Sequence, residues 1–178
     1  SVVGIVNADQ LLNACDFRAH ERAFQMLSQV AGRAGRRGSR GLVVLQTRKP
    51  DLPVVAQIVA GDYPAMYKKE MADRRTFRYP PEVRLIMISF KHRDERTVAV
   101  CARLFADLLR PHFGDDLFGP MKQVVSYVQL QHIRRIMLKV SPTLSPTSVR
   151  TTLWAARDRV LAHSACRNVT IYFDVEPM

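Results

Sequence analysis

The first fifty residues contain only two runs with the composition of buried β-strands, and one helical segment separates them. Residues 2–6 and 42–47 are rich in valine and leucine, as is typical of parallel strands covered on both faces. Residues 17–31 carry apolar side chains at helical spacing, with Asp16 as a candidate N-cap. Strand, helix and strand in this order predict an α/β sheet, but two strands are too few for a complete domain. We therefore expect this chain to be a fragment that starts inside a strand.

A second group of elements follows the proline pair at residues 80–81. Residues 52–77 before it are predicted to be helical, with Asp62 capping a second segment, and the prolines end that pattern. After it we predict a strand, a helix, two paired strands, a helix and a strand, at residues 83–91, 94–112, 123–130, 133–140, 145–165 and 169–175. Gly119 and Pro120 are predicted to break the chain before the strand pair. This order predicts an α+β domain of the split β-α-β (ferredoxin-like) type, in which two helices cover one face of an antiparallel sheet.

The chain has a net charge of +11, and the excess of positive charge lies at both ends. Residues 1–50 carry a net +5, residues 51–82 are neutral, and residues 83–178 carry +6. A basic chain favours a polyanionic partner, with nucleic acid first and an acidic protein tail second. A basic surface without a partner is the alternative, because the sequence does not place these charges in space.

The three cysteines, Cys15, Cys101 and Cys166, predict no metal site, because none has the spacing of a zinc-ligand pair. Cys101 and Cys166 lie among apolar residues of helical pattern, so we expect buried thiols and a reducing cytoplasm. No stretch approaches the roughly 18 apolar residues of a membrane span. The first residues are expected to form a strand instead of a signal peptide.

The segment with the clearest chemical character is QVAGRAGR at residues 29–36. Arg33 and Arg36 each follow a glycine, which lets the backbone approach a ligand while the guanidinium groups present several hydrogen-bond donors. This arrangement suits phosphate groups. A solvated basic turn is the alternative, because arginine-rich turns are common.

Several segments together resemble the PriA family of bacterial replication-restart helicases, which belong to superfamily 2. Residues 29–36 resemble helicase motif VI, and GIVNADQLL at residues 4–12 resembles the family's motif V. The other similar segments are DFRAHERAFQML, LQTRKPDLP, DYPAMYKKEMADRR and YPP, at residues 16–27, 45–53, 62–75 and 79–81. The resemblance therefore covers residues 4–81 nearly continuously.

The resemblance implies roles for the residues of motif VI. Arg33 and Arg36 would be catalytic, contacting the γ-phosphate of ATP held by the other motor lobe, with Arg36 as the better arginine-finger candidate. Gln29 and Gly32 would complete the nucleotide-binding motif. A helix C-cap is the alternative role for Gly32.

Motif V of the resemblance consists of Asn7, Ala8 and Asp9. In such motors it couples the nucleotide cleft to the DNA strand, so the resemblance implies that Asn7 contacts DNA and that Asp9 contributes to nucleotide binding. Asp9 precedes an apolar run, so capping a helix is the alternative role for its carboxylate.

The resemblance also implies a domain organisation, a cellular function and binding partners. Residues 1–50 would be the C-terminal part of a RecA-like helicase lobe 2, residues 51–82 a helical linker, and residues 83–178 a C-terminal α+β domain. The parent would be an ATP-dependent 3′-to-5′ DNA helicase of the bacterial cytoplasm and nucleoid. Its partners would be forked and single-stranded DNA, single-stranded DNA-binding protein and primosome proteins. We expect no association with a membrane.

The cofactors implied by the resemblance are ATP and Mg²⁺, bound mainly by lobe 1, and zinc in a separate module. The sequence contains no G-x-x-x-x-G-K-[ST] pattern, so this chain lacks a P-loop. We expect the chain alone to bind no cofactor or metal and to be inactive as an ATPase.

The predicted C-terminal domain has no evident catalytic group, and its resemblance to the family thins to a basic strand. For Arg134, Arg135 and Lys139 of that strand we expect DNA binding, with Tyr127 upstream to stack a base. A solvated sheet face is the alternative, because strand alternation puts Arg134 and Arg135 on opposite faces. Trp154 is predicted to lie in the core. The alternative function is a protein-docking module for single-stranded DNA-binding protein or primosome partners.

Overall fold

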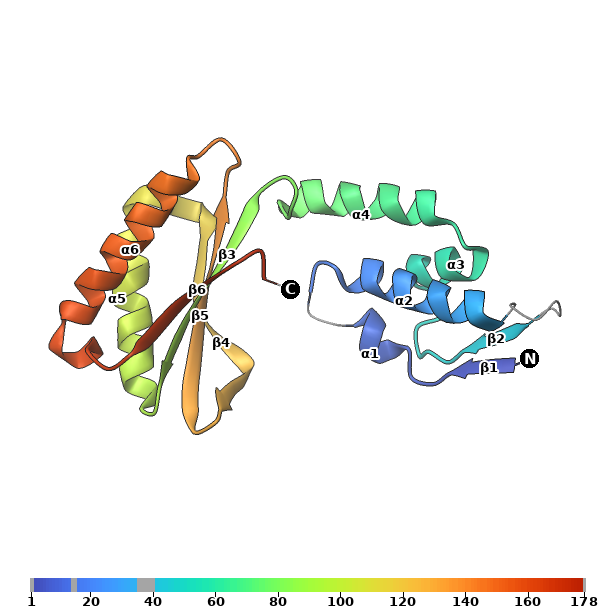
Figure 1. Ribbon diagram of the computed structural model, residues 1–178, viewed down its shortest axis with the longest axis horizontal. Helices are drawn as coiled ribbons and strands as arrows, with labels where there is room; N and C mark the ends of the chain where they lie inside the picture. Colours follow the sequence, from blue (N-terminus) through green and yellow to red (C-terminus); the bar gives the residue numbers. More distant parts are fainter. Residues whose placement is uncertain (1, 14–15, 35–40, 178) are drawn as a thin grey trace. The chain divides into compact units, whose positions relative to one another are not determined.

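The computed structural model describes residues 2–13, 16–34 and 41–177, except for the side chains of residues 123–125. The chain divides into two compact units, Ser1–Phe77 and Arg78–Met178. Each unit has its own β-sheet and its own helices (Figure 1).

The first unit is built on a parallel pair of strands joined by a helix. β1 (Val2–Ile5) pairs in parallel with β2 (Leu42–Leu45), and α2 (Ala19–Ala34) lies between them in the sequence. The predicted strand, helix and strand are therefore confirmed. The structure adds α1 (Asp9–Leu12), a single turn directly after β1 that was not predicted.

Both strands of this pair are more exposed than predicted. Val2 on β1 is 72% exposed, and Leu42 and Val44 on β2 are 59% and 50% exposed. The prediction of strands covered on both faces is wrong for this chain, because the described residues provide only two strands for this sheet. The buried cluster of the unit lies instead among α1, α2 and the next helix along the chain: Ala8, Leu12, Ala23, Leu27, Val54 and Val55.

Two further helices complete the first unit, α3 (Pro53–Ala60) and α4 (Tyr63–Phe77). The chain turns between them at Gly61, whose φ of 66° lies in the left-handed region that glycine tolerates. Asp62 then caps α4, as predicted, because its Oδ1 accepts a hydrogen bond from the Ala65 backbone N–H at 3.0 Å. Both helices pack against α2, so the helices of the predicted linker belong to this compact unit.

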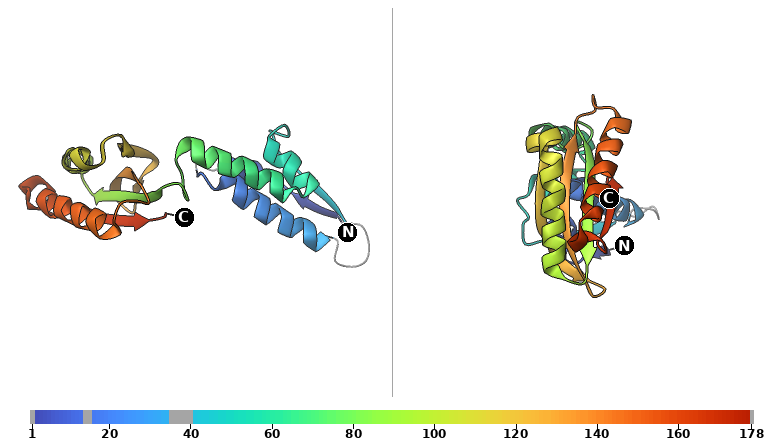
Figure 2. Two further views of the ribbon diagram at one scale, coloured as in Figure 1. Left: turned by 90° about the horizontal axis from the view of Figure 1, so that it is seen from above. Right: turned by 90° about the vertical axis from the view of Figure 1, so that its left-hand side faces the viewer.

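The second unit has the predicted order of strands and helices, β-α-β-β-α-β, with two short 3-10 turns, η1 and η2, inserted. Its elements are β3 (Arg84–His92), α5 (Glu95–Phe113), η1 (Gly114–Asp116), β4 (Leu117–Val128), β5 (Gln131–Val140), α6 (Pro146–Ala162), η2 (Ser164–Cys166) and β6 (Thr170–Val175). The order in the sheet is β4-β5-β3-β6, and all neighbouring strands are antiparallel. α5 and α6 lie on the same face of the sheet (Figures 1 and 2).

β4 begins earlier than predicted and includes Gly119 and Pro120, so the predicted chain break at these residues is wrong. β4 is an edge strand, and its register against β5 shifts between Phe118 and Met121. Proline fits an edge strand because one row of backbone groups there has no partner strand, and a shift of register accommodates residues that cannot pair. Gly119 has a φ of 108°, which side-chain-bearing residues rarely adopt.

The core of the second unit fills the space between its sheet and α5. Ile88 and Phe90 of β3 and Phe105 of α5 are fully buried, and the two phenylalanine rings meet edge to face at 5.3 Å between centroids. Cys101 and Cys166 are buried, as predicted, but they form a disulfide instead of two thiols. This part of the prediction is wrong because η2 packs against α5 and brings together two cysteines that are 65 residues apart in the sequence.

Trp154 lies at the edge of the core, contrary to the prediction that it is a core residue. Its side chain on α6 is 46% exposed. The buried residues of α6 form one stripe, Val149, Leu153, Ala156 and Val160. Trp154 follows Leu153 directly, which turns it about 100° away around the helix. Its ring lies 5.8 Å from the ring of Phe173, between centroids.

Candidate nucleotide and nucleic-acid sites

The carboxylate of Asp9 ties the ends of β1 and β2 together. Because the two strands are parallel, their carboxyl ends meet at one edge of the sheet. Asp9 Oδ1 accepts a hydrogen bond from Thr47 Oγ1 at 2.6 Å, and its two oxygens accept from the Arg48 backbone N–H at 3.2 and 3.1 Å. The hydrogen bond from Thr47, aided by the Arg48 N–H and the nearby cations, holds the pKa of Asp9 below its ordinary value. Asp9 is therefore a charged group in a fixed position.

The other two residues of the motif V segment lie in the same turn. Asn7 is exposed and has a φ of 57°, a left-handed conformation that asparagine adopts more readily than most residues. Ala8 is buried, and its N–H donates to the Gln46 carbonyl at 3.0 Å. The N-cap of α1 is Ala8, and the Asp9 carboxylate accepts hydrogen bonds from Thr47 and Arg48. The alternative that Asp9 caps a helix is therefore wrong.

The described residues of the segment that resembles motif VI lie in the last turns of α2. Gln29, Gly32 and Arg33 are all exposed, and Gly32 is inside the helix, which continues to Ala34. The C-cap alternative for Gly32 is therefore wrong. Arg33 forms no side-chain hydrogen bond or ion pair with another residue that the structure describes. Arg36 lies outside the described residues.

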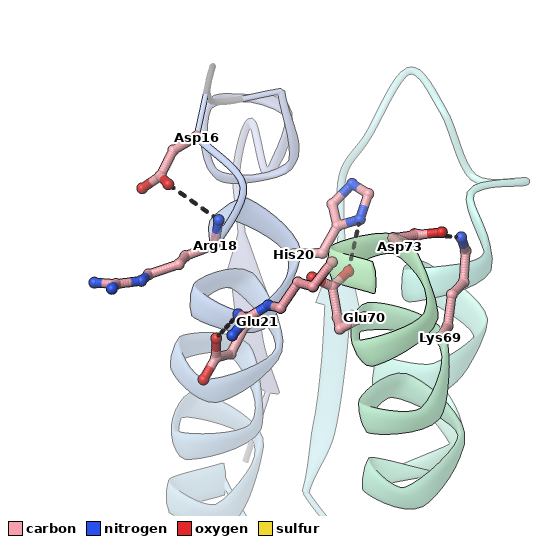
Figure 3. Close-up of polar contacts among 8 residues, drawn as sticks. Asp16, Arg18, His20, Glu21, Lys69, Glu70 and Asp73 are labelled. Atoms are coloured by element: carbon pink, nitrogen blue, oxygen red, sulfur yellow. Dashed lines mark hydrogen bonds and ion pairs between the residues drawn. The ribbon is translucent and has the colours of Figure 1, made fainter. Parts of the chain in front are cut away.

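Ion pairs between α2 and α4 hold the helix that carries these residues, and sequence reasoning missed them. Arg74 of α4 donates to Glu21 of α2 at 2.6 Å, and His20 of α2 lies 3.4 Å from Glu70 of α4. Figure 3 shows His20 and Glu70 pointing toward each other from the two helices. The Arg74 guanidinium also lies 5.3 Å from the centre of the Phe17 ring. The partners are about fifty residues apart in the sequence, so no local pattern marks them.

Arg134 and Arg135 lie on opposite faces of the second sheet, as strand alternation predicts. Arg134 is on the side of α5, where its guanidinium lies 3.5 Å from Glu95. Glu95 also accepts a hydrogen bond from Lys122 at 2.7 Å. This interaction with Lys122, the largest of several cationic ones, holds the pKa of Glu95 below its ordinary value. Tyr127 is paired with His132, on the Arg134 side of the sheet, and does not meet Arg135.

Lys139 is buried between two aromatic rings. Its side chain is 7% exposed, and its ammonium lies 4.4 Å from the centre of the Tyr79 ring and 5.0 Å from that of Phe118. Burial, followed by the positive charge of Arg78, lowers the pKa of Lys139. Lys139 therefore lies on the same strand as Arg134 and Arg135, but of the three side chains only that of Lys139 is buried.

An apolar cavity of about 510 Å³ lies between α6 and the sheet of the second unit. Its apolar lining includes Ile86, Val149, Leu153, Trp154, Ile171 and Phe173. Three cations also line it, Arg84, Arg150 and Arg157. The cavity suits an apolar group attached to an anionic one. No local sequence pattern predicts it, and Trp154, which lines it, was predicted to lie in the core.

The described part of the chain contains no group of three or more His, Cys, Asp or Glu side chains arranged to hold a metal ion. Within the same residues, no helix is long and apolar enough to cross a membrane.

Residues 75–178 match the family model described as the Primosomal protein N C-terminal domain. The chain is also similar to curated proteins named replication restart protein PriA. It is 40% identical over 140 residues to that of Treponema pallidum (strain Nichols), 33% over 141 residues to that of Bacillus subtilis (strain 168), and 30% over 180 residues to that of Synechocystis sp.. These matches cover 78%, 78% and 100% of this chain and 21%, 18% and 21% of the relatives. The chain spans about a fifth of the length of these relatives.

Proposed function

The chain belongs to the PriA family of replication restart proteins, and we propose that it works as part of an ATP-dependent 3′-to-5′ DNA helicase. This helicase recognises stalled or branched replication forks in the bacterial cytoplasm and nucleoid, and it restarts replication by primosome assembly. The activity belongs to the whole protein, of which this chain corresponds to about a fifth.

Within that protein, residues 1–50 form the end of a RecA-like lobe 2, residues 51–82 a helical connection, and residues 83–178 a ferredoxin-like domain. The exposed apolar side chains of β1 and β2 support the first assignment, because a parallel pair of this composition normally lies inside a larger covered sheet. The sheet order β4-β5-β3-β6, with two helices on one face, supports the last assignment.

Arg33 and Arg36 serve the motor by stabilising the γ-phosphate during its transfer, with Gln29, Gly32 and Asp9 as further residues on the nucleotide side. The observation that carries this proposal is the Asp9–Thr47 hydrogen bond, which fixes a charged motif V residue at the carboxyl edge of β1 and β2, where α/β sheets bind ligands. ATP and Mg²⁺ would be held mainly by residues outside this chain, since the sequence has no P-loop. The chain alone is therefore expected not to hydrolyse ATP.

The test of the motor assignment is Arg36→Ala in the complete helicase, with Arg40→Ala as the matched control from the same arginine-rich segment of the sequence. Loss of an arginine finger lowers the rate about a thousandfold or more, while nucleotide affinity is largely kept. DNA-stimulated ATP hydrolysis should therefore collapse for Arg36→Ala alone. Normal turnover by this variant would remove Arg36 from the mechanism.

The second unit would bind forked and single-stranded DNA, with Arg134, Arg135 and Lys139 as candidate contacts and Asn7 as a contact in the motor lobe. The net charge of +6 over residues 83–178 supports this. The test is fluorescence anisotropy of labelled forked DNA titrated with the chain at about 50 and 200 mM salt, where six phosphate contacts imply a loss of affinity near a thousandfold. Absence of binding at the lower salt concentration would reject DNA binding by this chain.

The cavity beside α6 supports a second candidate function, the docking of single-stranded DNA-binding protein or a primosome protein. Its apolar lining and its three arginines suit the end of a peptide that is both apolar and acidic. Titration with such a peptide should change the fluorescence of Trp154, the single tryptophan, which lines the cavity. Leu153→Asp should abolish this change, and an unaltered signal in that variant would reject docking at the cavity.

A further inference from the structure

The sheet of the second unit has a face that α5 and α6 do not cover (Figures 1 and 2), and we call it the open face. One row of side chains on this face crosses all four strands: Met121, Arg135, Ser89 and Tyr172. Lys91 lies two positions along β3 from Ser89 and shares the face. None of these residues contributes to the buried core cluster, which uses the alternate positions of the same strands.

Tyr172 presents its ring on the open face, because its neighbours Ile171 and Phe173 turn inward to the core. The Lys91 ammonium lies 4.8 Å from the centre of the Tyr172 ring. Burial acts to raise the pKa of Tyr172, but hydrogen bonds with Ser89 and Lys91 hold it below its ordinary value. The Tyr172 side chain is half-buried on this face, with the Lys91 ammonium over its ring.

Arg135 carries a positive charge on the open face that no carboxylate neutralises. Its side chain forms no hydrogen bond or ion pair with the described residues, and its buried Nε lacks a partner among them. Arg134, one residue earlier, pairs with Glu95 on the other face. Asp174 is the only acidic side chain that β3, β5 and β6 place on the open face, against Lys91, Arg135 and the buried Lys139. This face thus combines a half-buried tyrosine ring with Lys91, which lies over that ring, and Arg135, which pairs with no described carboxylate.

We propose that the open face binds single-stranded DNA, with Tyr172 stacking on one base and Lys91 and Arg135 contacting the phosphates beside it. The proposal rests on the proposed DNA binding of the second unit and names the form of DNA and the residues that hold it. Bases in a single strand expose the flat faces that a tyrosine ring stacks on, whereas bases in a duplex are already stacked. Cations beside an aromatic ring then supply the attraction to the phosphate backbone.

The experiment compares two oligonucleotides of equal length, oligodeoxythymidine and an abasic oligomer with the same phosphates and no bases. Binding of each oligonucleotide is measured by anisotropy competition for the 178-residue chain and for its variants Tyr172→Leu, Tyr172→Phe and Tyr67→Leu. Stacking of one base predicts that Tyr172→Leu weakens oligodeoxythymidine binding between about fivefold and a hundredfold. Tyr172→Phe keeps the ring and should stay close to the unmodified chain. Tyr67→Leu removes an exposed ring from α4 of the first unit, outside the open face, and should change nothing.

The abasic oligomer separates stacking from a general loss of structure. Tyr172→Leu should bind it as well as the unmodified chain does, because no base is present to stack, while a misfolded variant would lose both ligands. Arg135→Gln should weaken both ligands alike and lower the salt slope by about 0.7, the value for one single-strand phosphate contact. Equal binding of oligodeoxythymidine by Tyr172→Leu and the unmodified chain would overturn the proposal while leaving DNA binding by the unit intact. Absence of DNA binding by the unmodified chain would instead reject the function on which the proposal rests.

As a direct readout, an oligomer containing 5-iodouracil is irradiated in complex with the chain, and the crosslinked peptide is identified by mass spectrometry. The proposal expects the crosslink at Tyr172 or in its peptide. Crosslinks confined to other surfaces of the chain would overturn it.

Discussion

The Thr47 hydroxyl lies 2.6 Å from the carboxylate of Asp9, and this hydrogen bond joins the ends of two parallel strands from positions 38 residues apart. Asp9 follows β1 in the segment that resembles motif V, whereas Thr47 follows β2 in residues 45–53, another segment that resembles the family but for which no binding role was predicted. The pair shows how a charged side chain at a strand end is fixed by the neighbouring strand. Thr47 is thus a positioning residue for the candidate nucleotide site.

The first prediction is that Thr47→Val raises the pKa of Asp9 toward its ordinary value of 3.8, because the hydrogen bond from Thr47 is the largest cause of the lowered pKa. A carboxylate whose pKa is lower in the folded state than in the unfolded state stabilises the fold at pH values above its unfolded-state pKa. This stabilisation is lost as the pH falls through the folded-state pKa. The difference in stability between the chain and Thr47→Val should therefore be present at neutral pH and disappear in acid. NMR titration of the Asp9 carboxyl carbon measures the shift.

Thr47→Ser is the control for this titration, since it keeps the hydroxyl and should leave the pKa of Asp9 low. If Thr47→Val gives the same Asp9 pKa as the unmodified chain, the hydrogen bond is not what holds the carboxylate in its charged form.

A second prediction concerns the ion pair between Arg74 and Glu21, which joins α4 to α2, the helix that carries Gln29, Gly32 and Arg33. The Arg74 side chain is only 16% exposed, so its hydrogen bond to Glu21 is shielded more than a surface pair. Arg74→Met should destabilise the packing of α2 by about 1.5–3 kcal/mol, the range for a hydrogen bond to a charged group. Hydrogen exchange of the α2 amides measures this as a loss of protection.

Lys69 provides the matched control on the same helix, because it pairs with Asp73 along the exposed side of α4 (Figure 3). Lys69→Met should change the protection of α2 by little, as is usual for an exposed pair four residues apart. Equal effects of the two substitutions would mean that the Arg74–Glu21 pair does not hold the helices together.

The elements of the second unit could be predicted from the sequence because their signals are local. A nearly continuous run of apolar residues marks β3, the spacing of Val98, Cys101 and Phe105 marks α5, and Asp94 caps that helix by accepting from the Thr97 N–H. The signals at Gly119 and Pro120 were also local, but their meaning depends on the strand's place in the sheet. Because β4 lies at the edge of the sheet, Gly119 and Pro120 are accommodated in an irregular strand and do not end it.

The features that the sequence did not predict all join distant positions. Thr47 meets Asp9, Arg74 meets Glu21, and Cys101 meets Cys166 only after the elements have packed. The same holds for the open face, where Tyr172 and Lys91 come from β6 and β3. These strands are neighbours in the sheet but lie at opposite ends of the unit's sequence. Strand alternation did predict that Arg134 and Arg135 separate, but it could not say which of the two would find a carboxylate.

A third prediction concerns the disulfide between Cys101 and Cys166, which closes a loop of 65 residues. By the chain-entropy relation, a crosslink over a loop of this length stabilises the folded state by about 4 kcal/mol. A reducing agent should therefore lower the melting temperature of the second unit, as followed by the fluorescence of Trp154. The variant with both cysteines changed to alanine should melt at a temperature that the reducing agent does not alter. An unmodified chain that melts identically in oxidising and reducing buffer would show that the disulfide does not contribute to stability.

The last prediction concerns Phe105, whose fully buried ring packs edge to face on Phe90 and lies 6.2 Å from the ring of Phe173. Removing a buried phenylalanine ring leaves a cavity and costs about 3–5 kcal/mol, so Phe105→Ala should lower the free energy of unfolding of the second unit by that amount. Trp154 contacts Phe173 and reports this transition by its fluorescence during urea unfolding. Val100→Ala on the exposed side of the same helix α5 should change the free energy by less than about 0.5 kcal/mol, which controls for helix propensity. If the two substitutions cost the same, the stability of the unit does not depend on the packing between α5 and the sheet, and the open face would then lack the rigid support that its stacking role requires.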